Sequence, residues 1–480
     1  MTLPTDWTSR FESWVAPLLA DQDVPGLALA VGDAGRLVYF RGFGERDRAL
    51  GLPVTERTLF GIGSVTKSFT AVAILQLQEQ GRLSVDDPVA RHIPELRLPN
   101  VAGAHAMRIE HLLSHSAGLP PLPTLNACLA RALMADPEVD EKRRAKLPPP
   151  VDDFDQLIAF LNAREIDPIG LPGERFSYSN DGYALLGLVV ERASGEAYEA
   201  YVRDHILAPA GMEDSRFDIA PVVDGPDTTR LYNAHTDDAG RRAAREAGAW
   251  WDAGPMCAAG FLRSSARDML RYLEIFRNGG VVAGRRLLTP DGVAAMTRPR
   301  VPCDIGMAYG FGLMVSEDYG DQALTLVEHG GNIKGAAAWV SVVPERGLSV
   351  VGLSNLSGAP TGRATLGAVH AALGLEPGRP RRAARPGFAP VAPLADYVGR
   401  FASEEDANLV IAETDGALTL TTAGETFPLV PLEEDAFRVE SHGNVGHMTF
   451  LRGADGRVEA VRTGFRHVRR ASPASEPPSA

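Results

Sequence analysis

The hydrophobic pattern of this 480-residue chain changes across residues 376–393. This stretch is rich in proline, arginine and glycine, a composition typical of linkers. Strand and helix patterns precede it, whereas only short apolar runs separated by turn residues follow it. The change predicts two domains, residues 1–375 and 394–470, joined by the linker and followed by a disordered tail at 471–480.

The region after the linker has the regular spacing of a small all-β domain. Dipeptides that favour turns, such as Asp415-Gly416, separate its apolar runs. The pattern predicts a small antiparallel barrel or sandwich. The runs are Leu409–Ile411, Leu418–Leu420, Phe427–Val430, Phe437–Val439 and Thr449–Leu451.

Two hairpin patterns lie near opposite ends of the first domain. Leu27–Val31 and Leu37–Phe40 flank the turn signal Asp33-Ala34-Gly35. Ala338–Val343 and Leu348–Leu353 form a second pair of apolar runs. Because the first and last strands of a domain often pair, we expect both hairpins in one sheet.

Between the hairpins, apolar residues recur at helical spacing from Ser68 to Gln80, and Gly81 is suited to end that helix. Ser64 and Lys67 then lie in its first turn. Residues 120–155 are irregular and charged, and we interpret them as an inserted excursion. Their composition favours a solvated surface loop, and a cap over a cleft is the alternative.

Lys67 draws attention because lysine is scarce in this sequence. Only four of the 48 basic residues are lysines: Lys67, Lys142, Lys146 and Lys334. Arginine serves equally well on a solvated surface, but its guanidinium does not give up a proton and cannot act as a general base. A lysine in such a sequence therefore suggests proton chemistry.

The spacing Ser64-x-x-Lys67 places both side chains on one face of a helix. Burial and the positive end of the helix dipole both lower a lysine pKa. A shift from about 10.4 to about 7.5 requires roughly 4 kcal/mol. The alternative is a capping serine beside a surface lysine.

Two further motifs follow in the chain. Tyr178-Ser179-Asn180 precedes an apolar helix pattern, so Asn180 or Asp181 is suited either to cap that helix or to bind a ligand. His329-Gly330-Gly331-Asn332 precedes the apolar run Ala338–Val343, where two glycines permit a ligand backbone to approach or form a tight turn.

Together the three motifs resemble the serine β-lactamase and penicillin-binding protein superfamily, in the branch of class C β-lactamases, D-aminopeptidases and esterases similar to peptidase family S12. Other segments also resemble the family, among them Ile109–Leu119 and Tyr309–Gly312. The resemblance covers about residues 10–370. It implies an α/β (α+β) domain with an antiparallel sheet covered by helices and a helical subdomain. The segment Tyr397–Phe401 resembles the lipocalin-like barrel appended to some of these enzymes, where it can border the active site.

The resemblance also implies roles for individual residues. Ser64 is the expected acylated nucleophile, Lys67 its proton acceptor and Tyr178 the relay to the leaving group. Asn180 is expected to hold a substrate carbonyl. The remaining substrate-binding residues are His329, Gly331 and Asn332, with the backbone amides of Ser64 and Asn332 as the oxyanion hole.

One position departs from the family's lactamase pattern. His329 stands where many members have a lysine that attracts a substrate carboxylate, which argues against efficient β-lactamase action. Lys334 could supply part of that charge, but we interpret it as a surface lysine.

Other site signals are weak. His111 and His115 lie four residues apart without the glutamate of a zinc protease, so no metal is expected, and we expect no cofactor. Ile62 and Thr66 occupy the glycine positions of Gly-x-Ser-x-Gly, which excludes the α/β-hydrolase signature. Trp250 is suited equally to a pocket wall or to packing.

Composition limits the classes of binding partner and the cellular compartments that we expect. A net charge of −13 argues against nucleic acid or an anionic membrane as partner. Three scattered cysteines fit a reducing compartment, and no signal peptide or membrane span is evident. We therefore expect a cytoplasmic serine hydrolase acting on small amide or ester substrates or short peptides, either monomeric or homo-oligomeric. A weak β-lactamase and a silent binding protein are the alternatives.

Overall fold

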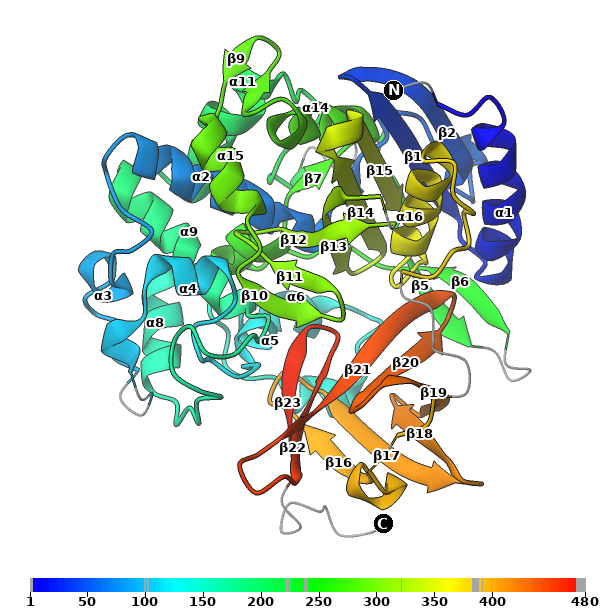
Figure 1. Ribbon diagram of the computed structural model, residues 1–480. Coiled ribbons are helices and arrows are strands. Elements are labelled where there is room, and N and C mark those ends of the chain that lie inside the picture. Colours follow the sequence, from blue (N-terminus) through cyan, green and yellow to red (C-terminus); the bar gives the residue numbers. More distant parts are fainter. Residues whose placement is uncertain are drawn as a thin grey trace.

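The chain folds into a helix-covered sheet followed by a β-barrel (Figure 1). This computed structural model describes residues 3–98, 101, 103–220, 225, 227–236, 241–320, 322–381, 388–390 and 392–471. Residues 382–387 and 391 of the expected linker and residues 472–480 of the expected tail lie outside the described residues.

Within the described residues, nine antiparallel strands form one sheet, in the order β10-β11-β12-β13-β14-β15-β1-β2-β3. β1 pairs with β2 on one side and with β15 on the other, so both predicted hairpins are confirmed and share one sheet. The strands are β1 (Gly26–Asp33), β2 (Arg36–Asp47), β3 (Leu52–Pro53), β10 (Val301–Asp304), β11 (Met307–Tyr309), β12 (Met314–Tyr319), β13 (Leu324–Ile333), β14 (Ala336–Val343) and β15 (Leu348–Ser354).

Side-chain alternation along β1 divides the core between the two faces of the sheet. Leu27, Leu29 and Val31 pack with residues of α1 (Trp7–Asp21) and α16 (Thr361–Ala372). Ala28 and Ala30 belong to the larger cluster on the opposite face, which includes residues of α14 (Ala266–Arg277). The sheet is therefore covered on both faces, as the resemblance implied.

The helical subdomain centres on α2 (Thr66–Glu79) and α9 (Asn180–Ser194), which pack together. The side chains of α2 are buried around almost its whole circumference, as expected for a central helix. Gly81 follows in the left-handed conformation (φ 71°), which confirms the predicted helix end. Other helices are α3 (Val89–His92), α4 (Ile109–Leu113), α5 (Thr124–Cys128), α6 (Ala130–Ala135), α7 (Glu141–Arg144), α8 (Phe154–Asn162), α10 (Tyr198–Val202), α11 (Ala208–Ala210), α13 (Cys257–Gly260) and α15 (Pro290–Thr297).

Short strands and single turns complete the first part of the chain. The strand pairs are β4 (Phe60–Gly61) with β7 (Arg263–Ser264), β5 (Tyr232–Thr236) with β6 (Arg242–Glu246), and β8 (Val281–Val282) with β9 (Arg285–Arg286). The turns are η1 (Gly63–Val65), η2 (Ala104–Ala106), η3 (Arg203–Leu207), η4 (Gly254–Met256), η5 (Pro344–Arg346) and η6 (Leu394–Asp396).

The excursion at residues 120–155 is not the solvated loop that its composition favoured. It contains α5, α6 and α7, and it buries Ala127, Leu129 and Leu133 in the main core. Only its second half, around Lys142 and Lys146, is exposed. The loop interpretation was wrong because short helices can bury apolar residues that show no long periodicity.

The C-terminal part is a closed antiparallel barrel of eight strands, all within the described residues. All five predicted runs lie in its strands, and aromatic residues including Tyr397 and Phe401 fill its core. The strands are β16 (Gly399–Ala402), β17 (Asn408–Thr414), β18 (Ala417–Thr422), β19 (Glu425–Glu433), β20 (Ala436–Ser441), β21 (Asn444–Arg452), β22 (Val458–Thr463) and β23 (Arg466–Arg470).

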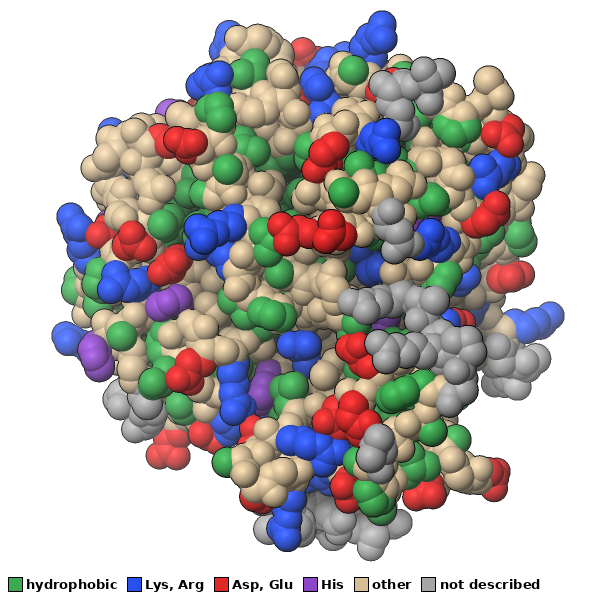
Figure 2. Space-filling model, in the orientation of Figure 1, with side chains coloured by type: hydrophobic (Ala, Val, Ile, Leu, Met, Phe, Trp, Pro, Cys, Tyr) green, Lys and Arg blue, Asp and Glu red, His purple; other side chains and the backbone are tan. Residues whose placement is uncertain are grey.

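Acidic and basic side chains are interspersed over the face shown in Figure 2. Of the helices in the described part of the chain, none has the length and apolar character that crossing a bilayer requires.

Candidate active site

Ser64 lies in a tight turn between the sheet and α2. The turn is η1, and Gly63 opens it with a φ of 50°. A side chain on Gly331 of β13 would overlap the Ile62 carbonyl and lie 2.9 Å from the Ser64 amide nitrogen. Glycine at 63 and 331 therefore allows the turn to press against β13, which brings the Ser64 and Asn332 backbones together.

Lys67 is fully buried in the first turn of α2, directly beneath Ser64. Its Nζ lies 3.2 Å from the Ser64 Oγ and 2.8 Å from the Asn180 Oδ1, and it donates to the Ala259 carbonyl. A neutral amine has two hydrogens and one lone pair. The Asn180 and Ala259 oxygens can only accept, so a neutral Lys67 turns its lone pair toward the Ser64 hydroxyl.

The environment of Lys67 favours this neutral form. Burial is the main cause that holds the pKa of Lys67 well below its ordinary value, and the positive charge of Arg466 lowers it further. The carboxylates of Glu405 and Asp181 act in the opposite direction. The geometry and the charges thus provide a proton acceptor beside a hydroxyl.

Tyr178 and Asn180 reach the site from the segment that leads into α9. The Tyr178 ring lies 4.7 Å from the Lys67 Nζ. Burial raises the Tyr178 pKa, and the nearby Ser64 hydroxyl partly opposes the rise. The Tyr178 hydroxyl does not form a full hydrogen bond with the Ser64 hydroxyl. It has no other hydrogen-bond partner among the described residues. Tyr178 therefore stays protonated at neutral pH.

The cap of α9 differs from the two candidates that the sequence offered. Ser179 caps the helix, because its side chain accepts a hydrogen bond from the Gly182 amide. Asn180 is therefore free to contact Lys67, and Asp181 is buried with its pKa raised to about 6, mainly by burial.

His115 supports this segment from behind. Its Nδ1 accepts a hydrogen bond from the Ser179 amide at 3.1 Å, its carbonyl accepts from the Ser177 amide, and its ring lies 4.1 Å from the ring of Tyr178. His115 thus holds the backbone that presents Tyr178 and Asn180.

The barrel contributes two charged residues to the site. Glu405 accepts a hydrogen bond from the Asn180 Nδ2 at 3.1 Å and two from the Arg466 guanidinium, at 2.5 and 3.1 Å. Arg466 lies over the Tyr178 ring at 4.6 Å. Because Glu405 accepts from the amide nitrogen, it fixes the orientation in which the Asn180 oxygen faces Lys67.

A pocket of about 430 Å³ opens above these groups. Ser64, Asn180 and Asn332 line it, together with Glu405 and Arg466 of the barrel. Its apolar lining includes Leu125, Leu129, Trp251 and Phe261. The excursion therefore does form a wall of the cleft, which agrees with the alternative that the sequence left open.

His329 does not line the pocket as a substrate-binding residue would. It lies within β13, which leads into β14, and its buried ring accepts a hydrogen bond from the Tyr309 hydroxyl at 2.8 Å. Its Nδ1 donates to the Gly330 carbonyl. Burial and the nearby Lys67 lower the His329 pKa to about 3, so the ring is neutral. It therefore offers no charge to a substrate carboxylate.

Lys334 is not the surface lysine that we expected. Its side chain is 3% exposed and forms ion pairs with Asp136 and Glu138 of the excursion. Trp251 donates a hydrogen bond to the same Asp136 carboxylate at 2.8 Å. The charge of Lys334 is therefore neutralised, and the cluster ties the excursion to the end of β13.

A family model described as Beta-lactamase matches residues 11–375 of the chain. The chain belongs to the beta-lactamase family. Esterase EstB of Burkholderia gladioli is 31% identical, with coverage of 72% of this chain and 90% of that protein. Penicillin-binding protein 4 of Amycolatopsis lactamdurans is 28% identical, with coverage of 73% and 84%. This beta-lactamase family member is thus a serine hydrolase of the β-lactamase and penicillin-binding protein superfamily.

For some relatives, the sequence match with this beta-lactamase family member covers less than half of the relative's length. Protein flp of Staphylococcus aureus (strain MW2) is 26% identical, and the match spans 45% of this chain and only 39% of that protein.

Two solved structures resemble almost the entire chain, barrel included. The octameric penicillin-binding protein homologue from Pyrococcus abyssi has a TM-score of 0.68 and 27% identity, with coverage of 96% of this chain and 99% of that one. SurE with D-Leu has a TM-score of 0.65 and 26% identity, with coverage of 98% and 100%.

The structure brings together Ser64, Lys67, Tyr178, Asn180 and the Gly331-Asn332 segment, as the three motifs predicted. Sequence reasoning missed Glu405, Arg466 and the Ala259 carbonyl. No local signal marks them, because Glu405 lies in a barrel loop and Arg466 begins β23, both far along the chain, and a backbone carbonyl has no signature.

Proposed function

We propose that the protein is an acyl-enzyme hydrolase of small amides or esters, including short peptides that contain D-residues. The observation that carries the proposal is the buried Lys67 amine, 3.2 Å from the Ser64 hydroxyl and positioned to accept its proton. The apolar walls of the pocket suit a compact acyl group. Similarity to an esterase and to SurE with D-Leu supports both substrate classes.

In the proposed reaction, the Ser64 oxygen attacks the substrate carbonyl carbon while its proton passes to Lys67. The backbone amides of Ser64 and Asn332 stabilise the oxyanion, and Asn180 contacts the substrate. Tyr178 donates its phenolic proton to the leaving nitrogen or oxygen and recovers a proton from Lys67. Water then attacks the acyl carbonyl and gives up a proton through Tyr178 to Lys67, and Lys67 returns that proton to the departing Ser64 oxygen.

A β-lactamase is the less favoured function. The position where many family members have a lysine for a penicillin carboxylate holds the neutral His329, and Lys334 nearby is paired with Asp136. A silent binding protein is less favoured as well, because it has no need for a buried lysine that costs stability without chemistry.

A comparison of three substrates tests the proposal. We expect turnover of a nitrophenyl ester or a D-alanine anilide to exceed turnover of a chromogenic cephalosporin by at least a hundredfold in kcat/KM. L-alanine anilide is the stereochemical control. Fastest turnover of the cephalosporin would contradict the proposal, and so would absence of turnover together with no fluorophosphonate adduct.

Glu405→Gln tests the barrel's part in this chemistry. Hydrogen bonds to a charged group contribute about 1.5–3 kcal/mol, so we expect kcat/KM to fall about tenfold or more as Asn180 and Arg466 lose their charged acceptor. The Glu405 carboxylate raises the Lys67 pKa, so its removal should also move the acid limb of the pH–rate profile to lower pH. The measurement is kcat/KM for the best substrate against pH.

Asp406→Asn is the matched control for Glu405→Gln. Asp406 is the neighbouring carboxylate in the same loop, but it accepts its hydrogen bond from the Asn126 Nδ2, at 2.7 Å. The Asp406→Asn variant should therefore have the same pH–rate profile as the native protein. An unshifted profile in Glu405→Gln would show that Glu405 does not act on Lys67.

We further infer that the enzyme works in the cytoplasm and associates into a homo-oligomer. All three cysteines are described, and all are buried free thiols, which suits a reducing compartment. The homologue from Pyrococcus abyssi is described as octameric. Light scattering of the purified protein tests the association, and a monomeric mass would contradict it.

A further inference from the structure

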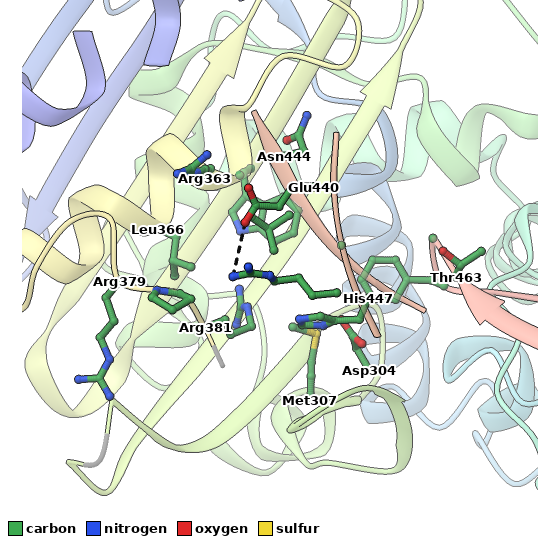
Figure 3. Close-up of a pocket in the computed structure, with 18 of the residues that line it drawn as sticks. Asp304, Met307, Arg363, Leu366, Arg379, Arg381, Glu440, Asn444, His447 and Thr463 are labelled. Carbon is green, nitrogen blue, oxygen red and sulfur yellow. Dashed lines mark hydrogen bonds and ion pairs between the residues drawn. The ribbon is translucent and has the colours of Figure 1, made fainter. Parts of the chain in front are cut away.

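A second cavity lies between the sheet domain and the barrel, on the other side of Phe465 from the catalytic groups. Its volume is about 330 Å³. Figure 3 shows residues of α16, β10, β11, the linker and the barrel turned toward one another around it. Its apolar lining includes Trp14, Met307, Trp339, Leu366 and Phe465.

Three arginines give this cavity an excess of positive charge. Arg363 of α16 donates to the Gly443 carbonyl at 3.2 Å, and Arg462 of β22 donates to the Pro302 carbonyl at 3.2 Å. Neither has a carboxylate partner among the described residues. Both guanidiniums therefore keep donors and full charge available.

The third arginine, Arg438 of β20, is only partly compensated. Its carboxylate partner, Glu440, lies 3.4 Å away and is 56% exposed. The Arg438 Nε is buried without a hydrogen-bond partner in the described part of the chain, which is costly for a charged donor. Arg438 lines the cavity, so its weakly compensated charge favours an anion there.

Two further basic residues of the cavity lining have acidic partners. Arg381 is paired with the fully buried Glu328 at 2.6 Å, and His447 contacts the Asp304 carboxylate at 2.9 Å. The surplus charge therefore comes from both domains: Arg363 from the sheet domain, and Arg438 and Arg462 from the barrel. These like charges line one cavity, so an anion bound there would lower their mutual repulsion.

The cavity shares a wall with the active site. Thr463, Gly464 and Phe465 line it, and the Phe465 carbonyl accepts the Tyr178 amide hydrogen at 2.9 Å. The next residue is Arg466, which lies over the Tyr178 ring. A ligand that orders this hairpin tip therefore also orders the contact with Tyr178.

We propose that this cavity binds a small carboxylate that carries an aromatic or aliphatic group, and that the bound molecule orders the segment 463–466. The carboxylate contacts the guanidiniums, and the apolar group packs on the tryptophans and Leu366. The site is separate from Ser64 and does not rest on the proposed function.

Titration calorimetry of the full chain with 2-naphthoate tests the site. We expect saturable binding at one site per chain, and at least tenfold weaker binding of the neutral 2-naphthalenemethanol. Acetate should not bind detectably, and decanoate shows whether an alkyl group is accepted as well as an aromatic one. The double variant Arg438→Gln/Arg462→Gln should weaken naphthoate binding at least tenfold.

Three further variants make this test specific. Arg285→Gln, an exposed arginine on β9, should bind like the native protein, and so should Ser64→Ala. If the double variant is unstable, Arg363→Gln on the opposite wall should show the same tenfold loss. No saturable binding of either carboxylate, equal affinity for the alcohol or unchanged affinity in the arginine variants would overturn the site.

Hydrogen exchange measures the ordering of the segment. Bound naphthoate should slow amide exchange in a peptide that spans residues 459–468 at least threefold in the native protein, and not in the double variant. Binding without this protection would overturn the proposed link to the active site.

Discussion

Ser64→Ala should abolish ester and amide hydrolysis while the protein remains folded. The substitution removes the Ser64 oxygen, the only atom that the proposed reaction acylates. Because Ser64 is partly exposed and lines the pocket, its loss leaves no large cavity in the core. We expect kcat to fall at least 10³-fold, in line with loss of a nucleophile that acts together with its base. The measurement is hydrolysis of a nitrophenyl ester, with mass spectrometry after fluorophosphonate treatment.

The labelling experiment has a simple control. Ser9→Ala changes an exposed serine near the N-terminus and should keep both turnover and the adduct. In the native protein, the added mass should lie on the peptide that contains Ser64. An adduct on another residue, or full labelling of Ser64→Ala, would reject Ser64 as the nucleophile.

Lys67→Arg should be nearly as damaging, although it preserves a basic side chain. The guanidinium remains protonated and cannot accept the Ser64 proton, so kcat should fall by about 10²–10⁴, the usual contribution of a general base. In the native protein, burial holds the pKa of Lys67 well below its ordinary value and so favours the neutral amine. Activity should therefore fall as the pH drops through the Lys67 pKa.

Lys146→Arg provides the matched comparison, because Lys146 is an exposed lysine of the excursion. It should retain native kcat and the native pH profile. If Lys67→Arg kept more than about a tenth of the native kcat, another group would have to accept the proton.

Local pattern was sufficient to predict most of the fold. The β1–β2 and β14–β15 hairpins and the helix after Ser64 follow from periodicity and turn residues. Apolar runs separated by turn residues also predicted five of the barrel strands. β23 was missed because its sequence, Arg466–Arg470, is mostly charged, although the Arg470 guanidinium lies over the ring of Phe401.

The site was predictable only where its residues carry motifs. Ser64, Lys67 and Tyr178 could be found in this way, but the environment of Lys334 could not. Its burial depends on Asp136, nearly two hundred residues earlier in the chain, and on the packing of α6. The same applies to Glu405, whose role depends on where the barrel docks and not on its neighbours in sequence.

The Glu405–Arg466 pair also has a consequence for biosynthesis. Arg466 is added by the ribosome long after Ser64 and Lys67, so the helical region can fold while Asn180 still lacks its partner from the barrel. The catalytic centre is therefore completed only when the barrel has been synthesised and packs against the helical region.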